Sequence, residues 1–284
     1  MSTAALVPGA VAVVTGGASG IGLAAAIRFC KMGLDVCIAD LGIERLESAA
    51  EAIVAAASMD PANLFAYEAD VSDPEQLRAL EAAVCDRFGG VDVLMNNAAI
   101  ATPTDILGPT EAWQSLLAIN LWGVIHGTQV FVPGMLARGR AGLVINTGSK
   151  QGITAPPGNP AYNLSKAGVK IFTEALQHQL RNTPGAKLSA HLLIPGFVFT
   201  GLSGAGLREK PAAAWTPEQT VDFMVERLDV GDFYILCPDN DVDRQLDERR
   251  IEWAADDIIE NRPPLSRWHS DYTNAFKVFS EKKR

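Results

Sequence analysis

Residues 11–22 read VAVVTGGASGIG, and this stretch decides the fold of the chain. Five apolar or β-branched residues predict a buried strand over 11–15. A turn with Gly16, Gly20 and Gly22 in the spacing GxxxGxG follows at once and leads into a helical pattern. Glycines let the backbone approach a pyrophosphate closely, and the free N–H groups of a helix start stabilise its charge. A strand, a glycine turn and a helix in this order indicate a dinucleotide site rather than a tight turn alone.

Short β-rich runs alternate with longer helical patterns along the rest of the chain. Most of these runs are apolar without polar alternation, as expected for strands covered on both faces of a parallel sheet. The seven predicted strands are 11–15, 35–40, 64–70, 91–96, 143–147, 188–194 and 233–237. We therefore expect a single doubly wound α/β domain of Rossmann type over residues 1–238, with a seven-stranded parallel sheet and helices on both faces.

Residues 239–284 are predicted to form a C-terminal extension. Pro238, Asp239 and Asn240 offer an N-cap for a charged helix that runs to about Glu260 and ends near Asn261. The apolar residues of the extension need a partner surface. We expect it to pack on the same domain, over the substrate mouth or as a simple cap, or on a neighbouring subunit.

Composition and charge exclude several classes of function. The formal charge of -9, the pI near 5.0 and the lack of a Lys/Arg-rich stretch argue against a nucleic-acid partner. The 4 cysteines and 4 histidines show no metal-ligand spacing, so we expect reduced structural thiols and no metal. The N-terminus has no basic signal-peptide start, and no run reaches about 18–20 uninterrupted apolar residues. We expect a cytoplasmic protein with no membrane span.

Asp40 ends the second predicted strand, where a carboxylate can accept hydrogen bonds from the ribose hydroxyls of adenosine. The same carboxylate would repel a 2′-phosphate. Leu41, Gly42 and Ile43 follow, so no cationic side chain comes directly after it, and the pattern favours NAD over NADP. Asp40 can also act as the N-cap of the next helix, alone or in addition.

Ser149, Tyr162 and Lys166 are the candidate catalytic residues. Tyr162 and Lys166 have helical i, i+4 spacing and share a face, while Ser149 follows the fifth predicted strand. Tyrosine, with a reference pKa of about 10, is a weak base unless the ammonium of Lys166 and an oxidised nicotinamide lower that pKa. Ser149 would donate a hydrogen bond to the substrate oxygen. A YxxxK pair alone is more often an ordinary turn of a surface helix. Its place in a sequence that also predicts a dinucleotide site favours the catalytic interpretation.

These residues resemble the short-chain dehydrogenase/reductase family, in its standard-length branch with TGxxxGIG and a Ser, Tyr, Lys active site. The resemblance covers roughly residues 7–238. It implies an oxidoreductase that interconverts a secondary alcohol and a ketone by hydride transfer, with Tyr162 as general acid/base, in a homodimer or homotetramer. Because fold alone does not establish chemistry, a noncatalytic NAD-binding regulator, or an epimerase or dehydratase with transient cofactor use, remains an alternative.

The resemblance also implies the roles of individual residues. Asn120 resembles the family's fourth catalytic residue, which kinks a helix and anchors a water; the alternative is a buried asparagine that satisfies backbone groups. Ala99 stands where the family usually has glycine, which leaves its backbone geometry in doubt, and Gly148 replaces a commoner serine. The implied cofactor-binding residues are Gly16, Ser19, Gly20, Ile21, Gly22, Asp40, Asp70, Val71, Asn97, Ala98, Tyr162, Lys166, Pro195, Gly196, Val198 and Thr200.

The glycine-rich stretch 197–214, with Gly204 and Gly206, predicts a loop that closes over a small-molecule substrate. We expect the substrate contacts to come from Ser149, Ile153, Tyr162, Phe197 and Leu202. The apolar members of this set favour an aromatic or alicyclic substrate, although the same side chains can equally pack in the core. The charged Arg208 and Lys210 on this loop are expected to be solvated.

Overall fold

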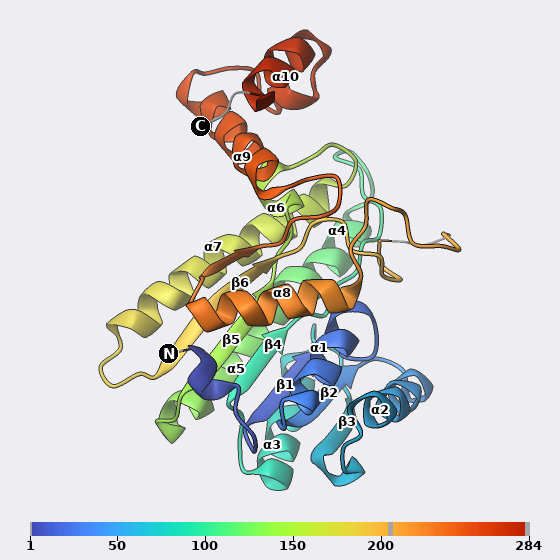
Figure 1. Ribbon diagram of the computed structural model, residues 1–284, viewed down its shortest axis with the longest axis vertical. Coiled ribbons are helices and arrows are strands. Elements are labelled where there is room, and N and C mark those ends of the chain that lie inside the picture. Colours follow the sequence, from blue (N-terminus) through green and yellow to red (C-terminus); the bar gives the residue numbers. More distant parts are fainter. Residues whose placement is uncertain (1, 204–206, 282–284) are drawn as a thin grey trace.

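The computed structural model describes residues 2–203 and 207–281 (Figure 1). One parallel sheet runs through it, with the strand order β3-β2-β1-β4-β5-β6-β7. The prediction of a seven-stranded doubly wound sheet is confirmed, and some strand ends differ from it by one or two residues. The strands are β1 (Val11–Thr15), β2 (Asp35–Asp40), β3 (Leu64–Glu68), β4 (Val93–Asn96), β5 (Gly142–Thr147), β6 (Leu188–Ile194) and β7 (Tyr234–Leu236).

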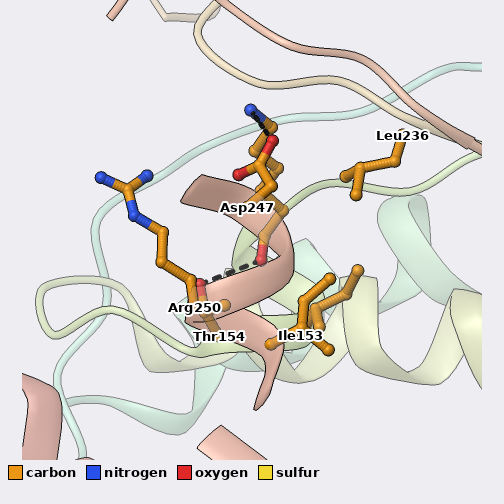
Figure 2. Close-up of a pocket in the computed structure, with 7 residues that line it drawn as sticks. Ile153, Thr154, Leu236, Asp247 and Arg250 are labelled. Carbon is orange, nitrogen blue, oxygen red and sulfur yellow. Dashed lines mark hydrogen bonds and ion pairs between the residues drawn. The ribbon is translucent and has the colours of Figure 1, made fainter. Parts of the chain in front are cut away.

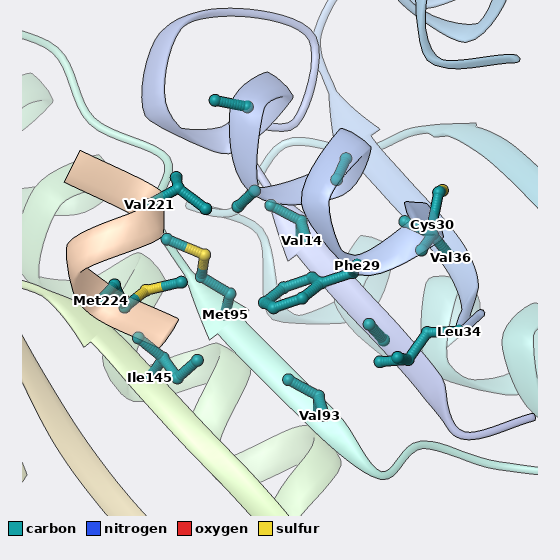
Figure 3. Close-up of a cluster of buried hydrophobic side chains, with 14 of the residues drawn as sticks. Val14, Phe29, Cys30, Leu34, Val36, Val93, Met95, Ile145, Val221 and Met224 are labelled. Carbon is teal, nitrogen blue, oxygen red and sulfur yellow. The ribbon is translucent and has the colours of Figure 1, made fainter. Parts of the chain in front are cut away.

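Helices cover both faces of the sheet, because alternate strand residues enter two separate cores. Ala12 and Val14 of β1 pack in the cluster that α1 and α8 cover, where Phe29 is fully buried (Figure 3). Val11 and Val13 pack in the other cluster, with side chains from α3, α5 and α7. The helices of the domain are α1 (Gly20–Lys31), α2 (Ile43–Ala57), α3 (Pro74–Phe88), α4 (Thr110–Leu117), α5 (Gly123–Arg138), α6 (Gln151–Thr154), α7 (Pro160–Asn182) and α8 (Pro217–Val230), with short 3-10 helices at Ser2–Ala5 and Pro61–Asn63.

A buried carboxylate fixes the amino-terminal edge of the sheet. Asp92 accepts a hydrogen bond from the Val11 N–H at 3.0 Å and lies 3.5 Å from Arg138 and 3.6 Å from Arg140. A buried charge is tolerated when it is paired and hydrogen-bonded in this way. Asp92 therefore ties β1 and β4 together at the edge opposite their carboxyl ends.

One helical stretch, Thr110–Arg138, is long and apolar enough to cross a membrane by length and composition. It arises because α4, a π-helical turn at Ala118–Trp122 and α5 run on as one helix, and polar residues interrupt its apolar sequence. Many of its residues are buried inside the protein, and α5 packs on β4. Core helices have the same composition, so the stretch is weak evidence of a span.

The C-terminal extension holds α9 (Arg244–Ile259) and α10 (Thr273–Glu281), with short 3-10 helices at Ser266–Trp268 and Ser270–Tyr272 between them. The predicted N-cap was wrong: Asp243 caps α9 by accepting the Leu246 N–H at 2.8 Å. Asn240 instead donates to the Ala214 carbonyl at 3.2 Å and so closes a loop. The helix ends at the predicted place, because Asn261 takes a positive φ of 51°.

The extension projects from the domain beyond α6 and carries an aromatic cluster of its own (Figure 1). The buried Trp253 ring lies 5.2–6.5 Å from the rings of Tyr272, Phe276 and Phe279. The guanidinium of Arg262 stacks over Trp253 at 4.0 Å from the ring centroid. These contacts fold α10 back onto α9.

Candidate active site

A cleft of about 690 Å³ lies at the carboxyl edge of the sheet, where the strand order reverses between β1 and β4. Its size is in the range of small-molecule and cofactor sites. Gly22, Asn120, Ile153 and Phe197 lie outside its lining. The other predicted site residues all line it, namely Gly16, Ser19, Gly20, Ile21, Asp40, Asp70, Val71, Asn97, Ala98, Ser149, Tyr162, Lys166, Pro195, Gly196, Val198, Thr200 and Leu202.

The tight packing of the glycine turn leaves no room for a side chain at Gly16 or Gly22. A Cβ on Gly16 would lie 2.8 Å from the Ala98 Cα, and one on Gly22 would lie 2.1 Å from the Gly16 oxygen. Gly22 therefore shapes the turn from behind rather than lining the cleft. Asn97 holds the turn against β4, since its side chain donates to the Gly16 oxygen at 3.3 Å. The backbone N–H groups at the start of α1 are left open to an anion.

Asp40 is held by backbone groups at the end of β2. Its carboxylate accepts the Ala18 N–H at 3.0 Å and the Leu41 N–H at 2.8 Å. It is not the N-cap of α2, which is Gly42, so the capping interpretation was wrong. Arg45, in the first turn of α2, forms an ion pair with Asp40 and also lines the cleft. Sequence reasoning missed Arg45, because only the residues directly after Asp40 were considered, and the helix brings its side chain back.

Ser149, Tyr162 and Lys166 converge in the cleft. The ammonium of Lys166 is buried, donates to the Thr147 carbonyl at 2.8 Å and lies 5.7 Å from the centroid of the Tyr162 ring. Burial lowers the pKa of Lys166 to about 8. Burial also raises the pKa of Tyr162, and a hydrogen bond with Ser149 opposes that shift. The Ser149 hydroxyl oxygen accepts the Gln151 N–H at 3.2 Å, and its proton is the one that can bond to the Tyr162 oxygen.

Tyr162 stands in the first turn of α7, and Asn159 fixes that turn. The Asn159 side-chain oxygen accepts the Tyr162 N–H at 3.4 Å and the Thr104 hydroxyl at 2.6 Å. Its amide donates to the Thr102 carbonyl at 3.0 Å. The loop between β4 and α4 is thereby tied to the helix of Tyr162. The sequence motifs did not indicate this contact, although Asn before Pro160 is an N-cap signal.

Asn120 lies fully buried in the π-helical turn Ala118–Trp122, between α4 and α5. Its side chain accepts the Ile100 N–H and donates to the Ile100 carbonyl, both at 2.8 Å. Both the oxygen and the amide nitrogen of the side chain thus bond to the Ile100 backbone. This agrees with the alternative interpretation of Asn120 as a buried asparagine that satisfies backbone groups. Ala99, whose geometry was in doubt, is not among the non-glycine residues with positive φ in the described ranges.

Two of the predicted substrate residues lie elsewhere. Ile153 lines a small cavity of about 20 Å³ against α9 (Figure 2). Phe197 pairs through its backbone with Trp215. Leu202 lines the cleft and is 40% exposed. Lys210 is not simply solvated, since its ammonium donates to the Ala214 carbonyl at 2.7 Å. Gly204 and Gly206 of the predicted closing loop lie outside the described residues.

Comparison with known proteins connects this geometry to a family. A family model for short chain dehydrogenases matches residues 10–210. The chain is 31% identical to a 3-oxoacyl-(acyl-carrier-protein) reductase of Thermotoga maritima, over 79% of this chain and 85% of the relative. It is 30% identical to a D-beta-hydroxybutyrate dehydrogenase of Rhizobium meliloti, over 67% of this chain and 72% of the relative. The structure of a short chain dehydrogenase/reductase from Burkholderia phymatum, solved in complex with NAD, is similar to this one with a TM-score of 0.79 and 29% sequence identity. The match covers 90% of this chain and 96% of that chain.

Proposed function

The chain belongs to the short-chain dehydrogenase/reductase family, and from this premise we propose that it is an NAD-dependent oxidoreductase that interconverts a secondary alcohol and a ketone. The observation that carries the proposal is the convergence of Ser149, Tyr162 and Lys166 in the cleft that the glycine turn opens. A noncatalytic binding protein has no need of a buried lysine beside a tyrosine that is hydrogen-bonded to a serine.

The three side chains divide the proton chemistry between them. When bound, oxidised nicotinamide accepts the hydride. Ser149 donates a hydrogen bond to the substrate oxygen and holds it near Tyr162. Tyr162 accepts the hydroxyl proton as general base, and in the reverse direction returns it as general acid. The ammonium of Lys166, 5.7 Å from the ring centroid, would stabilise the phenolate form and so oppose the effect of burial, which raises the pKa of Tyr162. Asn120 positions the Ile100 backbone, which lines the same cleft.

Asp40 supports NAD as the cofactor. Its carboxylate is fixed by two backbone N–H groups at the cleft wall, where it can accept bonds from ribose hydroxyls and repel a 2′-phosphate. Arg45 opposes this preference, because a guanidinium in the same wall can bind a phosphate. In this structure Arg45 pairs with Asp40, so its charge is already partly neutralised.

The substrate side of the cleft supports an aromatic or alicyclic ketone or alcohol. Ala99, Ile100 and Leu202 line the cleft with small or apolar side chains. Among the described residues that line the cleft, the two basic side chains are Arg45, which pairs with Asp40, and Lys166, which is buried. Apolar walls with a few convergent polar groups are usual for small-molecule sites.

The first experiment is turnover of the purified chain with NAD or NADP against a panel of secondary alcohols, with aromatic and alicyclic members. We expect NAD reduction, and a loss of about 10²- to 10⁴-fold in turnover for Tyr162→Phe with unchanged NAD affinity. Tyr67→Phe is the matched control, since Tyr67 lies on β3 outside the cleft lining. NAD binding without turnover across the panel would contradict the proposal and favour the regulator. Catalysis without net nicotinamide reduction would favour the epimerase or dehydratase.

A further inference from the structure

Lys150, the residue directly after Ser149, connects three separate segments of the chain. Its ammonium lies 3.2 Å from a carboxylate oxygen of Asp239 and 2.6 Å from one of Asp247. The side chains of all three residues are largely buried, at 14%, 7% and 5% exposed. A buried ion cluster of this kind holds one geometry, because separating its members leaves an uncompensated charge.

The Asp239 carboxylate of the cluster lies behind the part of the cleft wall that Pro195 and Gly196 form. The Asp239 oxygen that pairs with Lys150 also accepts the Phe197 N–H at 3.3 Å. A Cβ on Gly196 would lie 2.5 Å from that oxygen and 2.9 Å from the Lys150 nitrogen. The Lys150 N–H in turn donates to the Pro195 carbonyl at 3.2 Å. The cluster therefore fixes the Pro195 and Gly196 wall of the cleft relative to Ser149.

Asp247 belongs to the same C-terminal extension as Asp239. It stands in the first turn of α9 and lines the small cavity shown in Figure 2, where its carboxylate pairs with the Lys150 ammonium. Ile251, one turn further along, packs against the domain core beside Ile153. Arg250 lines the same cavity, and its positive charge acts on Asp247. The ion pair of Asp247 and the apolar packing of Ile251 thus hold α9 to the residues that follow Ser149.

We propose that Lys150 is a positioning residue, which uses the docked extension to hold Ser149 and the Pro195–Gly196 backbone in place for the reaction. The extension then acts as a brace of the active site rather than as a cap alone. Only the kinetic part of this inference depends on the proposed function. The structural part, the coupling of α9 to the two loops, can be measured without a substrate.

The test uses Asp247→Asn in the full-length chain, because this change keeps the side-chain shape and leaves the Lys150–Asp239 pair intact. We expect backbone amides in 148–154 and 195–199 to exchange with deuterium at least about threefold faster, although neither segment carries the substitution. With a substrate from the panel, we expect kcat/KM to fall about tenfold while the NAD dissociation constant changes by less than about twofold. Asp256→Asn, on the same helix, is the matched control and should change neither quantity.

A second variant, Lys150→Met, removes the cation and should increase exchange in the same segments and in α9. Unchanged exchange in 148–154 and 195–199 for Asp247→Asn would overturn the inference, whether or not Lys150→Met folds. Faster exchange with unchanged kcat/KM would equally overturn the positioning role. If the wild-type chain turns over no substrate, the proposed function fails, and the exchange result still decides whether the extension is coupled to the loops.

Discussion

Arg45 forms an ion pair with Asp40, and both side chains line the cleft. A cationic side chain that could bind a 2′-phosphate is therefore paired with a carboxylate that would repel one. The balance between these two charges sets the cofactor preference that the proposed function assumes.

Replacing Asp40 should change that preference. In Asp40→Ala the repulsion of a 2′-phosphate is lost and Arg45 is released, so we expect the ratio of kcat/KM for NADP to that for NAD to rise by about 10- to 100-fold, or about 1.4–2.7 kcal/mol. Steady-state kinetics with both cofactors measures this ratio. In Asp40→Ala/Arg45→Ala the gain for NADP should disappear. A gain that persists in the double variant would show that Arg45 has no part in it.

The buried ammonium of Lys166 predicts a pH-dependent stability. Its pKa is about 8 in the folded chain, against 10.5 for an ordinary lysine. Since the unfolded chain binds more protons between these values, Lys166 favours folding above pH 10.5, and this contribution is lost as the pH falls through 8. Lys166→Met lacks this dependence. We compare the free energy of unfolding of Lys166→Met with that of wild type. The variant's value minus the wild-type value should be larger at pH 7 than at pH 10, by up to about 3 kcal/mol.

Urea unfolding of both proteins at the two pH values checks this prediction. Lys170→Met is the control, because Lys170 pairs with Glu174 on the surface of the same helix. A stability difference between Lys166→Met and wild type that does not change with pH would mean that Lys166 is not desolvated in the folded chain.

Asn159→Ala should weaken both folding and catalysis. Loss of an N-cap costs about 0.5–2 kcal/mol of stability, and here it also frees the first turn of α7, which carries Tyr162. Thr216→Ala removes the N-cap of α8, away from the tyrosine, and is the matched control. We expect both variants to lose stability and only Asn159→Ala to lose turnover. Equal turnover in Asn159→Ala and Thr216→Ala would show that Asn159 does not position Tyr162 for the reaction.

Asn120→Ala distinguishes the two interpretations of this residue. If its side chain serves the Ile100 backbone, the variant leaves a partly buried donor and a partly buried acceptor without their partner, at up to about 1–3 kcal/mol for each. Chemical denaturation should show this loss in the absence of any ligand. A variant as stable as wild type but inactive would instead support a role confined to proton transfer.

The sequence was sufficient for the sheet and for most of the cleft, because both depend on local patterns. The apolar run before Gly16 and the Tyr162–Lys166 spacing act over a few residues, and a parallel sheet brings strand ends together without further information. What the sequence could not predict depends on contacts between distant segments. Arg45, the Asn159–Thr104 bond and the Lys150 cluster each join elements whose meeting only the packed chain defines.

The misplaced residues have the same cause. Ile153 is close in the chain to Ser149, and Phe197 follows Gly196 of the cleft lining. Both are apolar, which suits a substrate wall and a core position equally well. The docking of α9 turns Ile153 toward Asp247 and away from the cleft. The cap of α9 was misplaced by a few residues, since Asp239 and Asn240 form long-range contacts that their composition does not reveal.

The buried Asp92, at the edge of the sheet opposite the cleft, has a consequence for how this protein can change. Its bonds to Val11, Arg138 and Arg140 stabilise the sheet without touching any group that handles a ligand. Loops at the carboxyl edge can therefore be exchanged to suit a new substrate while the opposite edge keeps the molecule folded. The stability of the fold and the choice of ligand thus depend on opposite ends of the same strands, so substitutions can change the ligand that is bound without lowering the stability of the sheet.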